Sequence, residues 1–239
     1  FNPIYLQGVL GAGATFVYKF NDTVNLSVGY LARNADLPSE DNGLFNGSYA
    51  ALAQVAIAPS QNIDLGLTYV HAYYPQGKAF VSGVTGSRLA NTPFGATATS
   101  ADHFGLEFGY QISPDFVVSG WGGLTEAHAQ TNGIGLGDIV VNDGDNATIF
   151  NWAVTLGFPD FLGSERSFAG LVIGQPPKVT SNDSGAEDED TAWHLEASYR
   201  YKLNDNVTIN PGLLVILNPE HDRDNDTIWV GTVRTVFNF

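Results

Sequence analysis

The sequence predicts an all-β fold, an antiparallel transmembrane β-barrel, and three observations favour this class. Charged residues make up 15% of the 239 residues and aromatic residues 12%, so the chain is less charged than an average soluble domain. Apolar and polar residues alternate along several segments, as in strands with one apolar face and one face in contact with water. The apolar runs, such as 213–217, are too short for a membrane-spanning helix, and a closed barrel is the other structure that satisfies backbone groups in lipid.

The alternation is clearest at residues 193–203. One face of this segment is apolar or aromatic: Trp193, Leu195, Ala197, Tyr199, Tyr201 and Leu203. The opposite face is polar or charged: His194, Glu196, Ser198, Arg200 and Lys202. Because a dry sandwich core does not hold so many charges, the polar face is predicted to line a wet lumen.

Ten further segments show the same alternation, several of them more weakly, and complete a set of eleven expected strands. They span residues 11–20, 24–30, 49–57, 63–73, 104–110, 116–124, 148–158, 168–174, 207–217 and 227–239. Tight connections at 21–23, 59–62, 113–115 and 204–206 alternate with long ones at 35–47, 75–101, 126–146 and 175–191. Bacterial outer-membrane barrels have such short periplasmic turns and longer outer loops, and only 159–166 is longer than expected.

The organisation predicted is one domain, a transmembrane β-barrel over residues 1–239. Bacterial single-chain barrels have an even number of strands, so one or more strands are expected to precede Phe1. The chain is therefore interpreted as the C-terminal part of a barrel. Pro176 and Pro177 are expected to stop strand pairing at the outer end of 168–174.

The formal net charge is −15, which argues against nucleic acid as a partner. Most acidic residues fall in the expected outer loops. Eight of them form a predicted acidic outer rim: Asp143, Asp145, Glu187, Asp188, Glu189, Asp190, Asp222 and Asp224. This rim would concentrate cations at the mouth, or the same acids are solvated and bind divalent ions that bridge lipopolysaccharide.

The predicted lumen wall leans basic. Its expected pore-lining residues are Lys19, Arg33, Glu107, His194, Glu196, Arg200, Lys202 and Arg234. Ion selectivity stays open, because the narrowest ring dominates it and the sequence does not locate that ring. The connection 75–101 is either a constriction loop folded into the lumen or an ordinary outer loop. Aromatic residues near the expected strand ends fit interfacial girdles better than a sugar-binding slide inside the pore.

Signals of catalysis are poor. The chain has no cysteine, and its five histidines form no close pair at metal-ligand spacing. No nucleophile elbow or phosphate-binding loop is present, so no catalytic residue, metal site or cofactor is expected. Two rivals stay open: a hydrolase at the rim, and a structural barrel with a plugged lumen that tethers the membrane to the cell wall.

Five stretches carry a resemblance to a known family: residues 42–54, 66–70, 151–156, 174–179 and 218–235. They resemble the cyanobacterial outer-membrane porins of the OprB-type carbohydrate-selective family, often described as iron-uptake porins. The resemblance implies a barrel of about 16 strands, of which eleven lie in this chain. The alternating C-terminal residues that end in Phe239 also resemble the signal read by the barrel-insertion machinery.

The function that follows from the strand pattern and the resemblance is passive diffusion of inorganic ions, including iron, and of small hydrophilic solutes such as sugars. The expected location is a cyanobacterial outer membrane, in contact with its lipid and lipopolysaccharide. The resemblance also implies a homo-oligomer, a trimer, and an N-terminal periplasmic domain that binds peptidoglycan and would lie before Phe1.

Overall fold

The computed structural model describes residues 2–6, 11–37, 39–163 and 166–238, and its main element is one antiparallel sheet of eleven strands. In chain order these strands are β1 (Ala12–Lys19), β2 (Val24–Ala32), β3 (Tyr49–Ser60), β4 (Ile63–Tyr74), β5 (Thr99–Ser113), β6 (Phe116–Ala129), β9 (Asn146–Pro159), β10 (Phe168–Asn182), β11 (Trp193–Lys202), β12 (Val207–Leu217) and β13 (Ile228–Phe237). Each strand pairs with the next one along the chain. The predicted all-β antiparallel class and all eleven expected strands are confirmed.

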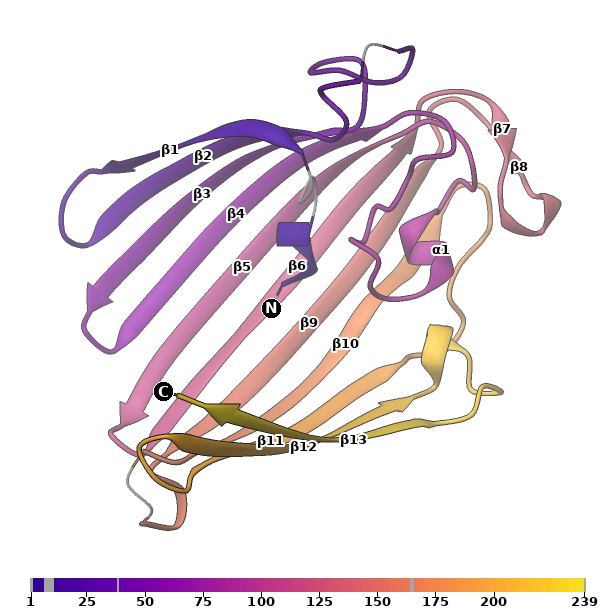
Figure 1. Ribbon diagram of the computed structural model, residues 1–239. Helices are drawn as coiled ribbons and strands as arrows, with labels where there is room; N and C mark the ends of the chain where they lie inside the picture. Colours follow the sequence, from indigo (N-terminus) through magenta and orange to yellow (C-terminus); the bar gives the residue numbers. More distant parts are fainter. Residues whose placement is uncertain (1, 7–10, 38, 164–165, 239) are drawn as a thin grey trace.

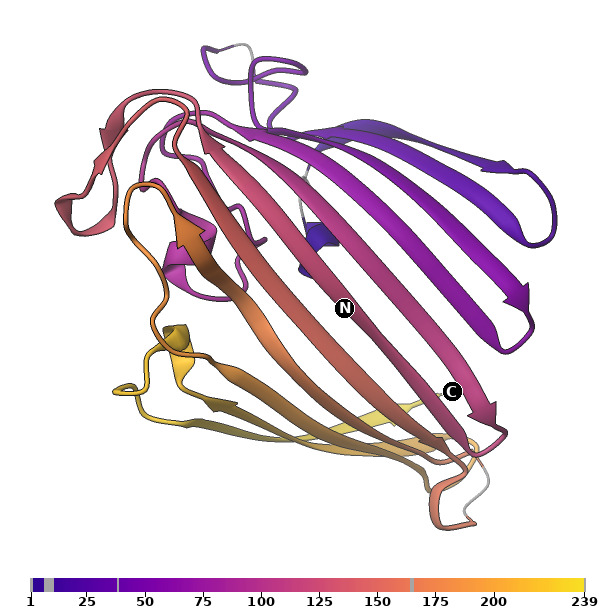
Figure 2. The same cartoon turned by 180° about the vertical axis from the view of Figure 1, so that it is seen from behind.

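The sheet curves into a deep trough with one concave and one convex side (Figures 1 and 2). Connections at one end of the trough are mostly tight turns, and we call this the turn end. The opposite end, which carries the long connections, is the loop end. Among the described residues the sheet runs from β1 to β13, and no pairing joins these two edge strands.

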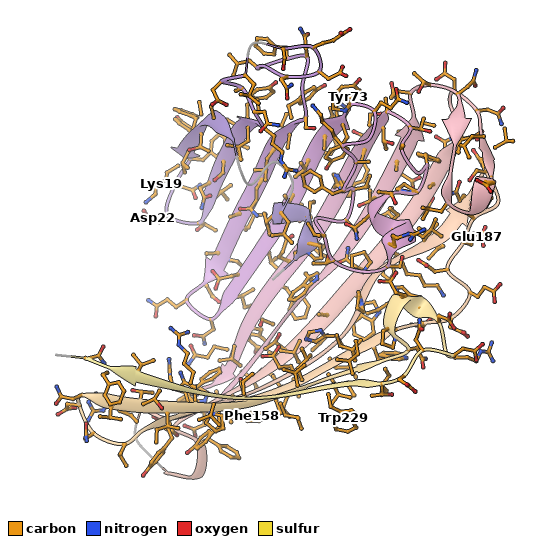
Figure 3. The ribbon with its side chains drawn as sticks, turned by 45° about the vertical axis from the view of Figure 1, so that its right-hand side comes forward. Lys19, Asp22, Tyr73, Phe158, Glu187 and Trp229 are labelled. Carbon is orange, nitrogen blue, oxygen red and sulfur yellow. The ribbon has the colours of Figure 1, made fainter. Side chains whose placement is uncertain are left out.

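Side chains alternate between the two sides of the sheet, as the period of a strand requires. On β4 the convex-side residues Leu65 and Leu67 are exposed, whereas Gly66 and Thr68 on the concave side are buried. Figure 3 shows Phe158 and Trp229 pointing away from the concave side. The large apolar residues that are exposed on the central strands therefore share the convex surface.

Four central strands are longer than the sequence predicted. β5 and β10 have 15 residues each, and β6 and β9 have 14 each. A tilted strand crosses a membrane with about 9–11 residues. Most of the extra residues lie at the loop end, where polar side chains such as Ser100 and Asp102 occupy the convex side and interrupt the apolar alternation.

Pro176 and Pro177 interrupt strand pairing, as predicted, but their strand does not end at the predicted residue 174. β10 continues to Asn182, with a register shift between Gln175 and Lys178 in its pairing with β9. Pairing with β11 has already ended at Gly174. The two prolines therefore occupy a bulge, where their missing N–H groups interrupt no regular ladder.

Two parts of the chain lie inside the trough (Figure 1). The N-terminal segment, residues 2–6, contains the 3₁₀ helix η1 (Pro3–Leu6). The inner segment, residues 75–98, connects β4 to β5 and contains the short helix α1 (Arg88–Asn91). Both pack on the concave side, and with the sheet they enclose a core that includes the fully buried Val81 and Phe94.

The remaining elements lie in connections. β7 (Gly133–Ile134) and β8 (Val140–Val141) form a small hairpin between β6 and β9, with the 3₁₀ helix η2 (Leu136–Asp138) at its tip. The 3₁₀ helices η3 (Phe161–Gly163) and η4 (Pro219–His221) lie in the connections that follow β9 and β12. No helix of the described residues is long and apolar enough to cross a membrane. The terminal Phe239 lies outside the described residues.

Candidate functional site

The inner segment is held by its own capping contacts before it meets the rest of the protein. The hydroxyl of Ser87 accepts a hydrogen bond from the Ala90 N–H at 2.9 Å and so caps the N-terminus of α1. The side chain of Asn91 donates to the carbonyl oxygens of Thr85 and Ser87 at 2.8 and 3.0 Å. A polar, glycine-rich stretch thus becomes a compact unit because its side chains satisfy its own backbone.

Contacts with three other connections hold the inner segment across the loop end of the trough. Asp188, between β10 and β11, accepts a hydrogen bond from the Ser87 hydroxyl at 2.8 Å. Glu220, between β12 and β13, accepts one from the Arg88 N–H at 2.6 Å. On the other side, the Lys78 ammonium donates to the carbonyl oxygen of Asp41 at 3.0 Å. The inner segment therefore bridges the two walls, and of the two arrangements that the sequence left open, the inward-folded one is observed.

His221 stabilises this attachment by joining two of the connections at the loop end through hydrogen bonds. Its Nδ1 accepts a hydrogen bond from the Ala192 N–H at 2.8 Å, so Nε2 carries the proton and donates to the Pro177 carbonyl oxygen at 2.9 Å. The imidazole is 2% exposed, and burial lowers its pKa. Burial raises the pKa of the neighbouring Asp188 carboxyl group. The geometry therefore holds a neutral histidine beside the acid that anchors Ser87.

The N-terminal segment docks on the wall formed by β3, β4 and β5. The Glu107 carboxylate accepts hydrogen bonds from the Asn2 side-chain amide at 2.8 Å and from the Thr68 hydroxyl at 3.1 Å. The Tyr5 hydroxyl lies 2.9 Å from the Thr68 hydroxyl. The N-terminal segment also lies against the inner segment, at Leu6 and Gly83. The two residues are so close that a Cβ atom added to Gly83 would lie 2.5 Å from the Leu6 Cβ atom. The two segments thus narrow the trough together.

A cavity of about 310 Å³ remains between these segments and the wall formed by β6, β9, β10 and β11. Its lining includes Trp121, Asn151, Thr155, His194 and Glu196. Glu196, like Ser198 and Arg200, is exposed on the concave side of β11. This part of the trough is open and carries exposed polar side chains on β11, whereas the part under the inner segment is closed and packed.

The strand register places the predicted pore-lining residues on the concave side. Arg33 contacts the inner segment, with its guanidinium 4.8 Å from the ring centroid of Phe80. The others follow from the pairing of concave-side positions across the sheet: Lys19, Glu107, His194, Glu196, Arg200, Lys202 and Arg234. That they line a water-filled pore stays a prediction.

The register also shows a gradient of charge along the trough that the sequence did not reveal. Lys19, Arg200, Lys202 and Arg234 all lie toward the turn end. The concave-side acids Glu107 and Glu196 lie closer to the middle of their strands. Apart from Arg33, which lies at the loop end and packs on Phe80, the concave-side bases therefore lie nearer the turn end than the two carboxylates do.

Only some of the turn-end bases are free of acidic partners. Arg200 packs over the Phe168 ring at 5.6 Å. Lys202 forms an ion pair with Asp205 at 3.0 Å, and Arg166 reaches the same carboxylate at 2.9 Å. The hydrogen bonds from Lys202 and Arg166 lower the pKa of the Asp205 carboxyl group. The positive charge of Lys202 is thus partly balanced, whereas Arg200 has no acid within ion-pair distance among the described residues.

The predicted acidic rim divides into two groups at the loop end. Five of its members are exposed: Asp143, Glu187, Glu189, Asp222 and Asp224. The other three are half-buried and accept hydrogen bonds: Asp145, Asp188 and Asp190. Asp190 receives the backbone N–H and the guanidinium of Arg223, and the backbone hydrogen bond is the main reason that its pKa is lowered. Glu187 marks the exposed group in Figure 3.

A polar cluster on the convex side was missed by the sequence reading. The Tyr69 hydroxyl donates to Asp102 at 2.6 Å, and His71 Nδ1 lies 2.9 Å from the same carboxylate oxygen. His128 Nε2 lies 3.8 Å from its other oxygen. The cluster lies toward the loop ends of β4, β5 and β6, beyond the apolar part of the convex surface. A polar residue at an apolar-face position, such as Asp102, was its only sequence signal.

Other residues were missed because they act through tertiary contacts. Asn2, Tyr5 and His221 lie in segments with no strand periodicity. Trp121 and Asn151 do lie on predicted strands, and a strict period-2 count from Glu107 across the sheet would have placed both on the concave side.

Comparisons with known proteins agree with this architecture. A protein of Synechocystis sp. with no characterised function is 43% identical over 248 residues, and one of Nostoc sp. is 32% identical over 250. Both alignments cover 100% of this chain, which spans 45% and 41% of those proteins. The chain thus covers less than half the length of these relatives.

Solved structures share the fold at low sequence identity. A porin refined at 1.8 Å resolution superposes with a TM-score of 0.60 at 9% identity, covering 95% of this chain and 61% of that one. An anion-selective porin from Comamonas acidovorans gives 0.57 at 12% identity, covering 92% and 55%. An outer membrane protein of Vibrio cholerae in its trimer form gives 0.56 at 12% identity, covering 94% and 62%.

The comparison with family models identifies the chain over almost its whole length. The match extends over residues 2–239, which include all eleven strands of the sheet and both segments inside the trough. The chain belongs to the carbohydrate-selective porin, OprB family.

Proposed function

We propose that the protein is an outer-membrane porin through which inorganic ions, including iron, and small hydrophilic solutes such as sugars diffuse passively. One observation carries the proposal: the concave side of β11 exposes Glu196, Ser198 and Arg200 while the convex side of the sheet is apolar. A soluble protein would bury its apolar face and expose its polar one. The reverse arrangement suits a wall between lipid and water.

The inner segment is the natural constriction of such a pore. It crosses the trough at the loop end and is attached to both walls through Asp188, Glu220 and Lys78. The cavity beside it is continuous with the exposed polar face of β11. We infer that solutes pass between the inner segment and the wall formed by β9, β10 and β11, where the lumen is not filled by packed side chains.

The lipid contact is proposed from the convex surface. Leu67, Phe104 and Leu106 are 48–55% exposed there, and no described element covers them. The polar cluster around Asp102 lies beyond this surface at the loop end, at the level expected for lipopolysaccharide headgroups. We infer a bacterial outer-membrane location, in a cyanobacterium by analogy with the Synechocystis and Nostoc relatives.

The whole protein is proposed to be a closed barrel of about 16 strands that assembles as a trimer. Support comes from the relatives, which are more than twice as long as this chain, and from the trimer form of the Vibrio cholerae protein. The peptidoglycan-binding domain that the resemblance implied belongs to the same proposal. These eleven strands would form the C-terminal part of the barrel, over residues 1–239.

A second candidate is a structural barrel whose lumen is plugged, and the presence of two segments inside the trough favours it. Conductance of the full-length protein in a planar bilayer separates the two functions. The porin proposal predicts stable open-pore current, and liposome swelling should then rank sugars by size while reversal potentials in unequal salt rank ions. Absence of any open-pore current from folded protein would favour the plugged barrel.

Iron needs an assay of its own. Proteoliposomes loaded with an iron chelator that reports by fluorescence should respond to external iron when they contain the porin and not when they lack it. A response equal to that of protein-free liposomes would remove iron from the proposed solutes.

A further inference from the structure

The cavity beside the inner segment has an unbalanced set of polar groups. Glu196 is the only carboxylate that lines it, and no lysine or arginine is among its lining residues in the described part of the chain. The contact of Glu196 with His194 Nε2 is long, at 3.4 Å. Its side chain is 44% exposed, so at least one carboxylate oxygen is available to a ligand.

A second acceptor lies deeper in the same cavity. Asn151 is 6% exposed, and its side-chain amide donates to the Gly123 carbonyl oxygen at 3.5 Å. Its Oδ1 atom has no hydrogen-bond partner among the described residues. Buried polar atoms normally have a partner, but this atom is itself shielded from solvent, so it could accept a donor from a ligand only after the Asn151 side chain had turned toward the cavity.

The other lining groups limit the chemistry of that donor. The Thr155 hydroxyl adds a further polar group, and the Trp121 indole contributes an aromatic surface and one buried N–H without a partner. An anionic solute would be repelled by Glu196, and a neutral solute would leave its charge uncompensated. A protonated amine supplies both the opposite charge and several N–H donors, and indole surfaces also attract cations.

We propose that this cavity is a binding site for organic solutes that carry a protonated amine, with the exposed carboxylate of Glu196 as the acceptor. A volume of about 310 Å³ suits a molecule of roughly monosaccharide size. The site rests on the proposed function in one respect, because its ligand must enter through an open lumen. The exposed acids at the loop end favour the arrival of cations at this site.

Three open-chain polyols test the proposal, because they share a six-carbon skeleton and differ in charge. Glucamine carries a protonated amine at pH 7.5, sorbitol is neutral and gluconate is an anion. Calorimetric titration of the full-length protein in detergent should give an affinity for glucamine at least about tenfold higher than for sorbitol, and no binding of gluconate.

Substitutions assign the preference to this cavity. Glu196→Gln keeps the shape of the side chain and should remove the preference for glucamine over sorbitol. Glu126→Gln is the matched control, since it removes one carboxylate from the convex side, where Glu126 contacts the Thr148 hydroxyl. Thr155→Val gives a second variant in the cavity and should weaken glucamine binding several-fold without changing the net charge.

Three results would overturn the site: equal affinities of the wild type for glucamine and sorbitol, a preference that survives Glu196→Gln, or no binding of glucamine. The titration does not depend on current. A conducting protein without the preference therefore refutes the site alone, and a non-conducting protein that prefers glucamine refutes the porin proposal alone.

Discussion

Replacing Asp188 by alanine should release the inner segment from the wall of the trough. One carboxylate oxygen, Oδ2, accepts both the Ser87 hydroxyl and the Val179 N–H, each at 2.8 Å. Val179 is fully buried, so alanine would leave its N–H without a partner, at a cost of about 1–3 kcal/mol. The hydrogen bond from Ser87 to a charged group contributes a similar amount, about 1.5–3 kcal/mol.

Because the Asp188 carboxylate is half-buried, the lower part of each range applies, and the expected total is about 2–4 kcal/mol. This shifts the balance between the attached and the released inner segment by roughly 30-fold to 1000-fold. Asp188→Asn keeps one acceptor oxygen for the Val179 N–H and should have about half the effect in free energy. Glu187→Ala is the control, since it removes an equal charge from the exposed neighbouring position.

Two assays of the full-length protein follow the release. Trypsin cleavage after Arg88, which lies in the inner segment, should be faster in Asp188→Ala than in the wild type. Single-channel recordings should show a larger or more frequently interrupted conductance. The reasoning fails if Asp188→Ala and Glu187→Ala give the same cleavage rate and the same conductance.

Three further predictions concern pH, ion selectivity and the two faces of the sheet. Burial lowers the pKa of His221 below its ordinary value of about 6.5. The stabilisation that neutral His221 gives the attached inner segment is therefore complete above about pH 6.5 and is lost as pH falls through the lowered pKa. Trypsin cleavage at Arg88 should rise on acidification for this reason. Because the pKa of Asp188 is raised, its proton uptake stabilises the attached inner segment as pH falls, which opposes the effect of His221. The acid-induced rise in cleavage rate should therefore be steeper in Asp188→Asn and absent in His221→Leu. Arg200→Gln should move the reversal potential in unequal salt toward cation selectivity more than Lys202→Gln, because Asp205 already balances Lys202. Leu195→Arg on the convex side should cost about 2–4 kcal/mol and reduce folding measured by gel mobility, whereas Ser198→Arg on the concave side should be tolerated.

Alternation predicted the fold well because each strand in a membrane wall has the same two environments on its two sides. Residues 193–203 illustrate this, since their polar and apolar faces coincide with the concave and convex sides of β11. The rule weakens where the environment changes along a strand. Asp102 lies on the convex side beyond the apolar surface, so the pattern breaks there and β5 was predicted to start at residue 104 instead of Thr99.

The path of the inner segment could not be predicted from residues 75–101, because a glycine-rich and threonine-rich stretch suits a solvated loop and an inward one equally. What decides between them is a set of distant partners, such as Asn182, whose side chain donates to the Pro93 carbonyl oxygen at 3.1 Å. The same limit applies to the acidic rim. Glu187 and Asp188 are adjacent acids, yet one is exposed and the other anchors Ser87.

The most direct test of the account is the accessibility of alternate positions along β11 in intact outer membranes. The chain has no cysteine, so single-cysteine variants at each position from Trp193 to Lys202 can be labelled without background from this sequence. A small water-soluble thiol reagent should react at the five even-numbered positions, which start at His194, and spare the odd-numbered ones. Uniform labelling, or labelling that repeats every three to four residues, would contradict a strand that separates lipid from water.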